Sequence, residues 1–330
     1  MKKLGLLIIF TVFFSQPCLA FKIEVLQVGN ISAFDDAYKG FVDELAKNGI
    51  AEGKNLTIQR TIIDAQADAG LWKKMVILLK IKSAASDIVS AKPDLVMTIS
   101  TPATKYSMDK IIGAGIPLVF SCVANPPIIG CPSVSQSSKG MTGATLYQDP
   151  LNFLVLAQMA KPDIKKMGLI HSDDDNAIAF AQEFTKKAAP LGITIQAIQV
   201  EKSASLKPYA QELIKKVGVD SFAIPLDAYY GLRDQEQGKV LFAVCKEAKI
   251  PVFAFANYDE KGALLYAGPD FSHIGMLSGK QAIAILKDGK KPETLPILKQ
   301  EALNIYVDKE IAAVLGIKIS DKLLKHAKLR

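Results

Sequence analysis

The chain repeats one order of apolar segments, and this internal repeat restricts the folds it can adopt. An apolar run around Val25 is followed by a helical apolar pattern, by Gly49 and by an alternating apolar run. A run around Gly168 begins the same order again, and Gly192 ends its helical pattern, so both pairs are separated by 143 positions. Alternating strands and helices fold into parallel sheets with right-handed crossovers and helices on both faces. The sequence therefore predicts an α/β protein with two similar doubly wound parallel-sheet lobes.

A later pair of segments, 93–99 and 219–224, keeps the order of the repeat. The duplication requires the chain to pass between the lobes near residues 141–147, again near 266–270, and once more in its final segment. We expect the first lobe to comprise residues 21–143 plus about 269–294, and the second lobe to comprise residues 144–268 plus about 295–330. The strands that cross between the lobes would then form a hinge.

The N-terminus is typical of a secretory signal peptide. Lys2 and Lys3 precede an apolar run over residues 4–14, and Ala20 is a small residue at the predicted cleavage point. The run is shorter than the ~20 apolar residues that a membrane-spanning helix needs. We therefore expect residues 1–20 to be removed and the rest of the chain to be periplasmic or otherwise extracytoplasmic.

Composition and charge exclude several classes of protein. Of the 330 residues, 49% are hydrophobic and 22% are charged, which is ordinary for a globular protein and unlike a disordered, collagen-like or disulfide-dense chain. The length predicts about two domains, each large enough to bury a core. The formal net charge of +7 is modest, so it indicates a lysine-rich surface and no nucleic-acid partner.

The cysteines and histidines give little support for metal or cofactor chemistry. Cys18 lies in the predicted leader, and the residues before it differ from a lipoprotein signal. Cys122 and Cys131 flank a turn-rich stretch at 125–130, so an oxidising compartment would allow a local disulfide, with two free thiols as the alternative. Cys245 lies in an apolar helical run and is expected to be a buried thiol. No cysteine pair has metal-site spacing and the three histidines are scattered, so we expect neither a metal nor a cofactor.

Candidate binding residues follow from the predicted topology. Ligands of open parallel sheets bind outside the carboxyl ends of the strands, and two lobes place their two sets of loops across a cleft. The candidate ligand-binding residues in those loops are Asn30, Phe34, Asp35, Ser100, Thr101, Thr104, Ser121, Asn125, Tyr147, Asn176, Asp227, Tyr229, Asn257, Tyr258 and Asp270.

The chemistry of these side chains favours a small zwitterion. Thr101 and Asn176 lie at predicted helix starts, which suit a carboxylate, although a cap with no ligand is the alternative for Thr101. Asp227 and Asp270 follow strands and suit an ammonium group, with a turn-forming role as the alternative for Asp270. Four aromatic residues could enclose an apolar or aromatic ligand side chain: Phe34, Tyr147, Tyr229 and Tyr258.

Catalytic motifs of α/β enzymes are missing from the sequence. There is no Gly-x-Ser-x-Gly elbow and no phosphate-binding Gly-x-x-x-x-Gly-Lys-Ser/Thr loop, and Asn30-Ile31-Ser32-Ala33 stands where a dinucleotide fingerprint would follow the first strand. We therefore expect a binding protein. A ligand-sensing receptor subunit and, less favoured, an α/β enzyme are the alternatives.

Several short motifs also carry a resemblance. They run in order along nearly the whole chain after residue 20: Gly40-Phe41, Gly53-Lys54-Asn55-Leu56-Thr57-Ile58, Pro93-Asp94-Leu95-Val96, Thr101-Pro102-Ala103, Ile116-Pro117-Leu118-Val119-Phe120, Thr142-Gly143, Ile250-Pro251-Val252-Phe253, Gly262-Ala263-Leu264 and Leu315-Gly316-Ile317. In these motifs the chain resembles the ABC-transporter substrate-binding family of the tryptophan/tyrosine type, a branch of the type I periplasmic binding proteins.

The resemblance implies a fold and partners. It implies two lobes joined by crossover strands, a small-molecule ligand held in the cleft by hinge closure, and delivery to an ABC permease in the inner membrane. We expect a monomeric binding protein, and the side chains described above favour an amino acid as its ligand. Asn125 stands where the family often has a carboxylate before the proline, so a hydrogen bond replaces a charge contact there.

Overall fold

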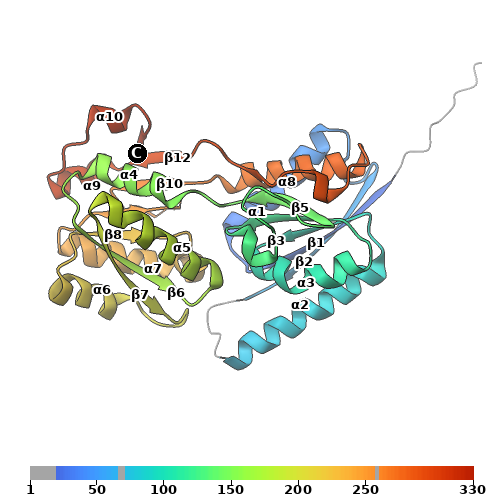
Figure 1. Cartoon of the computed structure of the whole chain (residues 1–330), viewed down its shortest axis with the longest axis horizontal. Coiled ribbons are helices and arrows are strands. Elements are labelled where there is room, and N and C mark those ends of the chain that lie inside the picture. Colours follow the sequence, from blue (N-terminus) through green and yellow to red (C-terminus); the bar gives the residue numbers. More distant parts are fainter. Residues whose placement is uncertain (1–19, 66–70, 257–259) are drawn as a thin grey trace, which may run out of the picture.

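The computed structural model describes residues 20–65, 71–256 and 260–330. It forms two α/β lobes that lie side by side, with the C-terminal end of the chain in the second lobe (Figure 1). Nearly all of the predicted signal peptide, together with Asn257 and Tyr258, lies outside the described residues. No helix in the described part of the chain is long and apolar enough to span a membrane.

The first lobe is built on a parallel sheet of six strands in the order β11-β5-β4-β3-β1-β2. These strands are β1 (Phe21–Val28), β2 (Leu56–Ile63), β3 (Leu95–Ile99), β4 (Leu118–Val123), β5 (Met141–Thr145) and β11 (Leu298–Lys299). Its helices are α1 (Ser32–Lys47), α2 (Leu71–Ala91), α3 (Thr101–Gly113) and α8 (Phe271–Leu286). Helices α1 and α8 pack together on one face of the sheet, and α2 and α3 cover the other.

The second lobe is built on a sheet of seven strands in the order β13-β12-β10-β9-β8-β6-β7. These strands are β6 (Lys166–Ser172), β7 (Thr194–Val200), β8 (Ser221–Ile224), β9 (Val252–Ala254), β10 (Leu265–Gly268), β12 (Asn304–Val307) and β13 (Lys328–Leu329). Its α-helices are α4 (Pro150–Ala160), α5 (Asp175–Ala188), α6 (Lys207–Glu212), α7 (Ala228–Glu247), α9 (Lys309–Leu315) and α10 (Asp321–Leu324). Short 3-10 turns lie at Pro126–Ile129, Ala189–Leu191 and Pro292–Thr294, and a π turn at Leu213–Val217 follows α6.

The two sheets share one topology, which confirms the predicted pair of similar parallel-sheet lobes. The order β5-β4-β3-β1-β2 in the first sheet matches β10-β9-β8-β6-β7 in the second. Strand β1 pairs in parallel with β2 and β3, just as β6 pairs in parallel with β7 and β8. Between β10 and β12 the pairing is antiparallel, because the chain enters β12 from the first lobe and not through a helical crossover.

Apolar strands explain why both sheets are buried on both faces. The side chains of β3 and β4 are all buried, which is typical of parallel strands covered by helices on each side. Each lobe has two apolar clusters, one on each face of its sheet. The helices are therefore fixed to the sheets, and each lobe has its own core.

In the part of the chain that the structure describes, three segments pass between the lobes. It crosses after β5, after β10 and after β11 (Figure 1). Strand β11 pairs with β5 of the first sheet, so the first sheet extends beyond the boundary expected near residue 294. Within the described residues, the covalent links between the lobes are single extended segments, an arrangement that allows a hinge.

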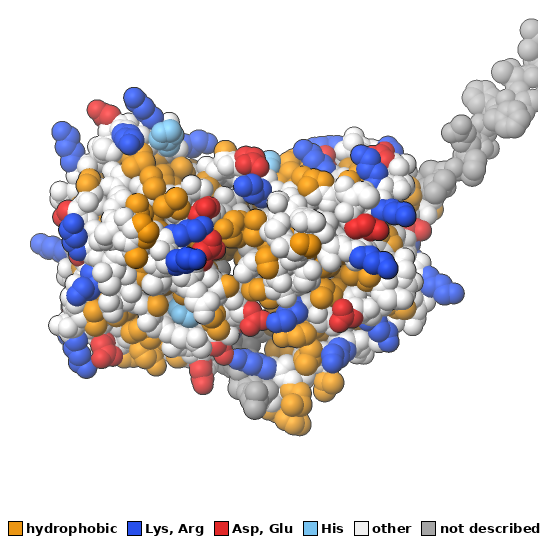
Figure 2. All heavy atoms as spheres, viewed as in Figure 1, with side chains coloured by type: hydrophobic (Ala, Val, Ile, Leu, Met, Phe, Trp, Pro, Cys, Tyr) orange, Lys and Arg blue, Asp and Glu red, His pale blue; other side chains and the backbone are white. Residues whose placement is uncertain are grey.

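Helix α2 carries apolar side chains on its outer face. Trp72, Met75, Val76 and Leu79 are exposed, with Trp72 at 75%. Figure 2 shows hydrophobic side chains gathered at the lower tip of the first lobe, over the start of α2. The single tryptophan is therefore on the surface of the first lobe, outside its core.

Helices α1 and α8 approach each other unusually closely because glycines line their contact. A Cβ added at Gly275 would lie 1.8 Å from the carbonyl oxygen of Ala37, and one added at Gly40 would lie 2.0 Å from that of Ser272. Both obstacles are backbone atoms, which cannot rotate away. Since α1 and α8 come from opposite ends of the chain, this contact joins the C-terminal part of the first lobe to its N-terminal part.

We predict that Gly275→Ala lowers the free energy of unfolding by about 3 kcal/mol, because overpacking against backbone forces the two helices apart. Gly113→Ala is the matched control, since a Cβ at this position in α3 would meet nothing within 4 Å. The control should be neutral or slightly stabilising. Urea unfolding of both variants tests this, and equal midpoints would contradict the close contact.

Candidate functional site

A cavity of about 670 Å³ lies between the lobes. This volume is within the usual range for small-molecule sites, roughly 300–1,000 Å³. Five of the described helices begin at its walls, and each contributes residues at or beside its first turn. Helices α1, α3 and α8 belong to the first lobe, and α5 and α7 belong to the second. Because parallel strands all end at the same edge of a sheet, the helix starts of both lobes meet here.

The N-terminus of α3 presents hydroxyl groups to the cavity. Ser100 is its N-cap, with φ 94°, and its hydroxyl accepts a 3.4 Å hydrogen bond from the backbone N–H of Ala103. Thr101 and Pro102 follow in the first turn and also line the cavity. The positive end of a helix and nearby hydroxyls suit an anionic group such as a carboxylate.

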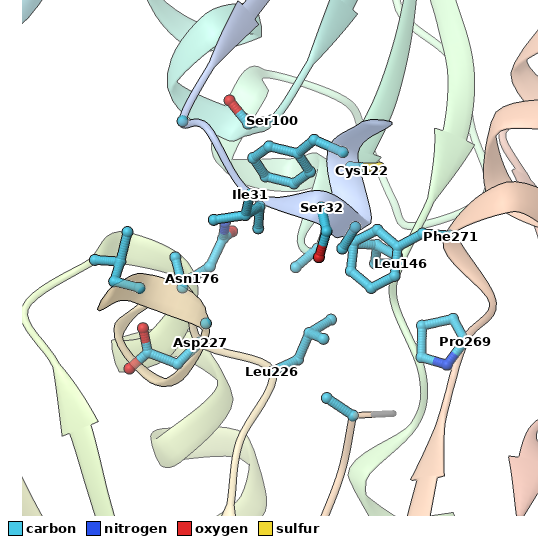
Figure 3. Close-up of a pocket in the computed structure, with 18 of the residues that line it drawn as sticks. Ile31, Ser32, Ser100, Cys122, Leu146, Asn176, Leu226, Asp227, Pro269 and Phe271 are labelled. Atoms are coloured by element: carbon cyan, nitrogen blue, oxygen red, sulfur yellow. The ribbon is translucent and has the colours of Figure 1, made fainter. Parts of the chain in front are cut away.

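An apolar wall faces the polar side of the cavity. Figure 3 shows Leu146, Pro269 and Phe271 on one side of the pocket and Asn176 and Asp227 on the other. The rings of Phe34 and Phe271 are tilted against each other, with centroids 6.3 Å apart. The cavity therefore has two chemically different ends, one for an apolar group and one for polar groups.

Asp227 lines the cavity, but its carboxylate is already hydrogen-bonded within the second lobe. Its Oδ2 accepts from the backbone N–H of Ser172 at 2.7 Å, and its Oδ1 accepts from the Ser172 hydroxyl at 2.9 Å and from the N–H of Tyr229 at 3.0 Å. Burial raises the pKa of this carboxyl, and the charge of Asp174 raises it further, against the lowering effect of these hydrogen bonds. Asp227 thus ties the start of α7 to the end of β6.

Charged residues that the sequence did not indicate also line the cavity. Lys202 Nζ lies 2.7 Å from the carboxylate of Asp174, and both residues face the cavity from the second lobe. Lys202 follows the carboxyl end of β7, so the strand-end rule that indicated the other residues would have found it. Tyr306 and Arg330 come from the C-terminal segment, which has no counterpart in the first half of the repeat.

The structure brings six of the predicted site residues to this cavity: Phe34, Ser100, Thr101, Asn176, Asp227 and Asp270. Asn125 and Tyr147 line a smaller neighbouring cavity of about 40 Å³ that shares Asn176 with the first. The Tyr147 hydroxyl donates to Glu183 at 2.9 Å. These two residues are therefore beside the main cavity and not in it.

The other predicted residues that the structure describes are held elsewhere. Asp35 pairs with Arg60, and the exposed Asn30 does not line the cavity. Thr104 is buried and donates to the carbonyl of Ser100 at 3.0 Å, while Ser121 is buried in β4. Tyr229 points into the core of the second lobe, where its hydroxyl donates to the carbonyl of Ala204 at 2.7 Å.

The possible disulfide between Cys122 and Cys131 is not formed. Both thiols are free and buried, and they belong to apolar clusters on opposite faces of the first sheet. Burial raises the pKa of Cys122 to about 12 and that of Cys131 to about 11, so both remain protonated. The turn-rich stretch between them does not bring them together, because the sheet separates them. Cys245 is a buried free thiol, as expected.

Polar contacts also join the two lobes at the rim of the cavity. The Asn176 side-chain amide donates to the Thr101 hydroxyl at 2.7 Å. Lys105 of α3 pairs with Asp175 of α5, and Lys74 of α2 pairs with Asp173. Asp173 and Asp175 therefore face basic side chains of the first lobe, whereas Asp174 pairs with Lys202 within the second lobe. No cluster of metal-ligating side chains occurs among the described residues.

A two-lobed α/β protein with crossover strands and an interlobe cavity has the type I periplasmic binding fold. The sequence model of the ABC transporter substrate binding protein family matches residues 22–329, and the chain belongs to this family. It is the substrate-binding component of an ABC transporter.

Known proteins of the same kind are similar over nearly the whole chain. A tyrosine-binding protein of Clostridioides difficile strain R20291 is 25% identical over 312 residues, which cover 93% of this chain and 84% of the relative. The crystal structure of a conserved domain protein from Vibrio cholerae is 25% identical, with a TM-score of 0.78, and covers 94% of this chain and 99% of its own. The structure of an ABC domain in complex with L-Trp from Streptococcus pneumoniae is 23% identical, with a TM-score of 0.76 and the same coverage.

We predict that Asp227→Ala lowers the free energy of unfolding of the unliganded protein by about 2 kcal/mol. The variant loses the cap of α7 and leaves the buried N–H of Ser172 without its acceptor. The control is Asp87→Ala at an exposed position of α2, which should change stability by less than about 0.5 kcal/mol. Denaturant unfolding without ligand is the measurement. An Asp227→Ala variant with the parent's free energy of unfolding would mean that these hydrogen bonds do not contribute to stability.

Proposed function

We propose that the protein captures an amino acid with an aromatic side chain between its lobes for an ABC importer. The observation that carries this proposal is the division of one interlobe cavity into an apolar wall with Phe34 and Phe271 and a polar side with Asn176 and Asp227. A free amino acid has the same division, because its ammonium and carboxylate groups lie at one end and its side chain at the other.

The polar groups of the ligand have separate partners in this proposal. The hydroxyls of Ser100 and Thr101 at the start of α3 receive the carboxylate. On the polar side, the carboxylate of Asp227 favours the ammonium group through its charge, while Asp174 is paired with Lys202 and Asp270 caps α8 beside Phe271. The ligands named for the C. difficile relative and the S. pneumoniae structure, tyrosine and L-Trp, support an aromatic side chain.

Hinge closure is the proposed means of capture. Ligand bound to the cavity touches both lobes, so it favours the conformation in which they are close. The rim contacts Lys105–Asp175, Lys74–Asp173 and Asn176–Thr101 then join the lobes around it. Figure 2 shows basic and acidic side chains near each other where the two lobes meet.

Delivery and location complete the proposal. The family implies an ABC permease as the partner. In the proposal this permease lies in the inner membrane and the binding protein acts as a monomer. The basic N-terminus and apolar run of the leader support export to the periplasm or another extracytoplasmic space.

We predict that L-tryptophan and L-tyrosine bind the purified protein and that a hexose of similar size does not. Phe34→Ala should weaken binding of either amino acid by about 2 kcal/mol, because it removes a buried aromatic contact with the ligand side chain. Isothermal titration calorimetry measures the affinities, and X-ray scattering with saturating ligand should show a smaller radius of gyration.

Tyr106→Ala provides the control for this experiment, because Tyr106 is 41% exposed on α3 and does not line the cavity. It should bind like the parent. Absence of any heat with both amino acids would refute the proposed ligand class, and an unchanged radius of gyration would refute closure.

We also predict that the exported protein begins at Phe21. N-terminal sequencing of protein recovered from the cell envelope tests this. Retention of residues 1–20, or a lipid on Cys18, would contradict cleavage after Ala20.

A further inference from the structure

Helix α7 is interrupted by a left-handed turn. Leu232 leaves the helical conformation, and the next three residues, Arg233, Asp234 and Gln235, all have positive φ between 51° and 59°. None of the three is glycine, and a run of such residues is costly for L-amino acids. Strained backbone of this kind persists only where the surroundings hold it, and it is concentrated at functional sites.

Side-chain contacts hold this turn from several directions. Arg233 donates to the carbonyl of Lys202 at 3.3 Å and pairs with Glu236 at 2.7 Å. The buried Gln237 accepts a hydrogen bond from the N–H of Leu206 at 3.0 Å, which fixes the helix immediately after the turn. The turn is thus attached to the segment after β7 that also carries Lys202 into the cavity.

The turn brings the Gln235 side chain to the cavity. Gln235 Oε1 and Asn176 Oδ1 are buried without a hydrogen-bond partner, and both residues line the cavity between the lobes. A buried acceptor without a donor is destabilising, so the two atoms favour a ligand that supplies N–H groups. The Asp227 carboxylate beside them already accepts three hydrogen bonds from Ser172 and Tyr229.

We propose that Gln235, aimed by the left-handed turn at Leu232–Gln235, is a specificity-determining residue that accepts a hydrogen bond from the ligand's ammonium group together with Asn176. This inference rests on the proposed function. The ammonium group then has neutral amide oxygens as its direct acceptors, and Asp227 acts on it through its charge. Both amides belong to helices of the second lobe, and Figure 3 shows Asn176 opposite the apolar wall, so the pair favours ligands that combine an N–H donor with an apolar group.

The test compares two ligands with two substitutions of Gln235. L-tryptophan has the ammonium group, and indole-3-propionate has the same ring and carboxylate without it. Gln235→Gly removes the side chain and relieves the positive φ, so it should melt at or above the parent temperature and bind L-tryptophan about tenfold or more weakly. Gln235→Met keeps the length of the side chain but removes its acceptor. It should show the same loss of affinity for L-tryptophan, and it replaces the glycine variant in the test if that variant is poorly folded.

Indole-3-propionate should bind the parent and both variants with equal affinity, because it has no ammonium group for Gln235 to recognise. Lys249→Gly is the matched control, since Lys249 has φ 56° just beyond the other end of α7, is exposed and does not line the cavity. It should gain stability and bind L-tryptophan like the parent.

The outcomes separate the two proposals. A parent that binds neither L-tryptophan nor L-tyrosine overturns the proposed function and this inference with it. A parent that binds L-tryptophan, with Gln235 variants within twofold of it, overturns the role of Gln235 alone. An equal loss of affinity for L-tryptophan and indole-3-propionate also overturns it, because Gln235 would then act on a part common to both ligands.

Discussion

Parallel pairing of the strands determines where this protein can bind a ligand. Each parallel pair requires a crossover that returns the chain to the same edge of the sheet, and here the crossovers are mainly helices. A helix that follows one of the parallel strands therefore begins at the carboxyl edge, where its free N–H groups and positive dipole end are presented. Because the chain contains this unit twice, the two carboxyl edges face each other, and the cavity forms between them.

The rim contacts are suited to a reversible closure. Exposed ion pairs such as Lys105–Asp175 contribute roughly 0–1 kcal/mol each, and the side chains of both residues are at least one-third exposed. A few contacts of this size bias the lobes towards each other but do not hold them shut against solvent. A ligand that touches both walls adds several kcal/mol of differential affinity, enough to make the closed state dominant. Thr101 and Asn176 belong to the cavity and to the rim, so they connect ligand binding with closure.

The sequence predicted the fold well because its signals are local and repeated. Apolar strands, helical patterns and terminal glycines such as Gly49 and Gly192 are each determined by a few neighbouring residues. The positions of six cavity residues followed from strand ends alone. For other residues, the position within a helical turn determines whether the side chain faces the cavity or the core. Tyr229 is two positions after Asp227, yet its side chain turns into the core. Gln235 could not be predicted, since none of Arg233, Asp234 and Gln235 is a glycine and the nearby Gly231 and Gly238 have no positive φ. The contacts of the turn with Lys202 and Leu206 come from a distant segment.

Neutral acceptors for the ammonium group suit a protein that must release its ligand. If a buried carboxylate had the ligand as its only partner, its charge would be unpaired each time the ligand left the cavity, at a cost of several kcal/mol. An amide left without its donor costs only about 1–3 kcal/mol, and water can replace the ligand there. Asp227 avoids the larger cost because Ser172 and Tyr229 satisfy its oxygens whether or not ligand is present. The charge of Asp227 thus attracts the ligand while its hydrogen bonds to Ser172 and Tyr229 stay in place. The hydrogen bonds that change on binding and release are made by Asn176 and Gln235.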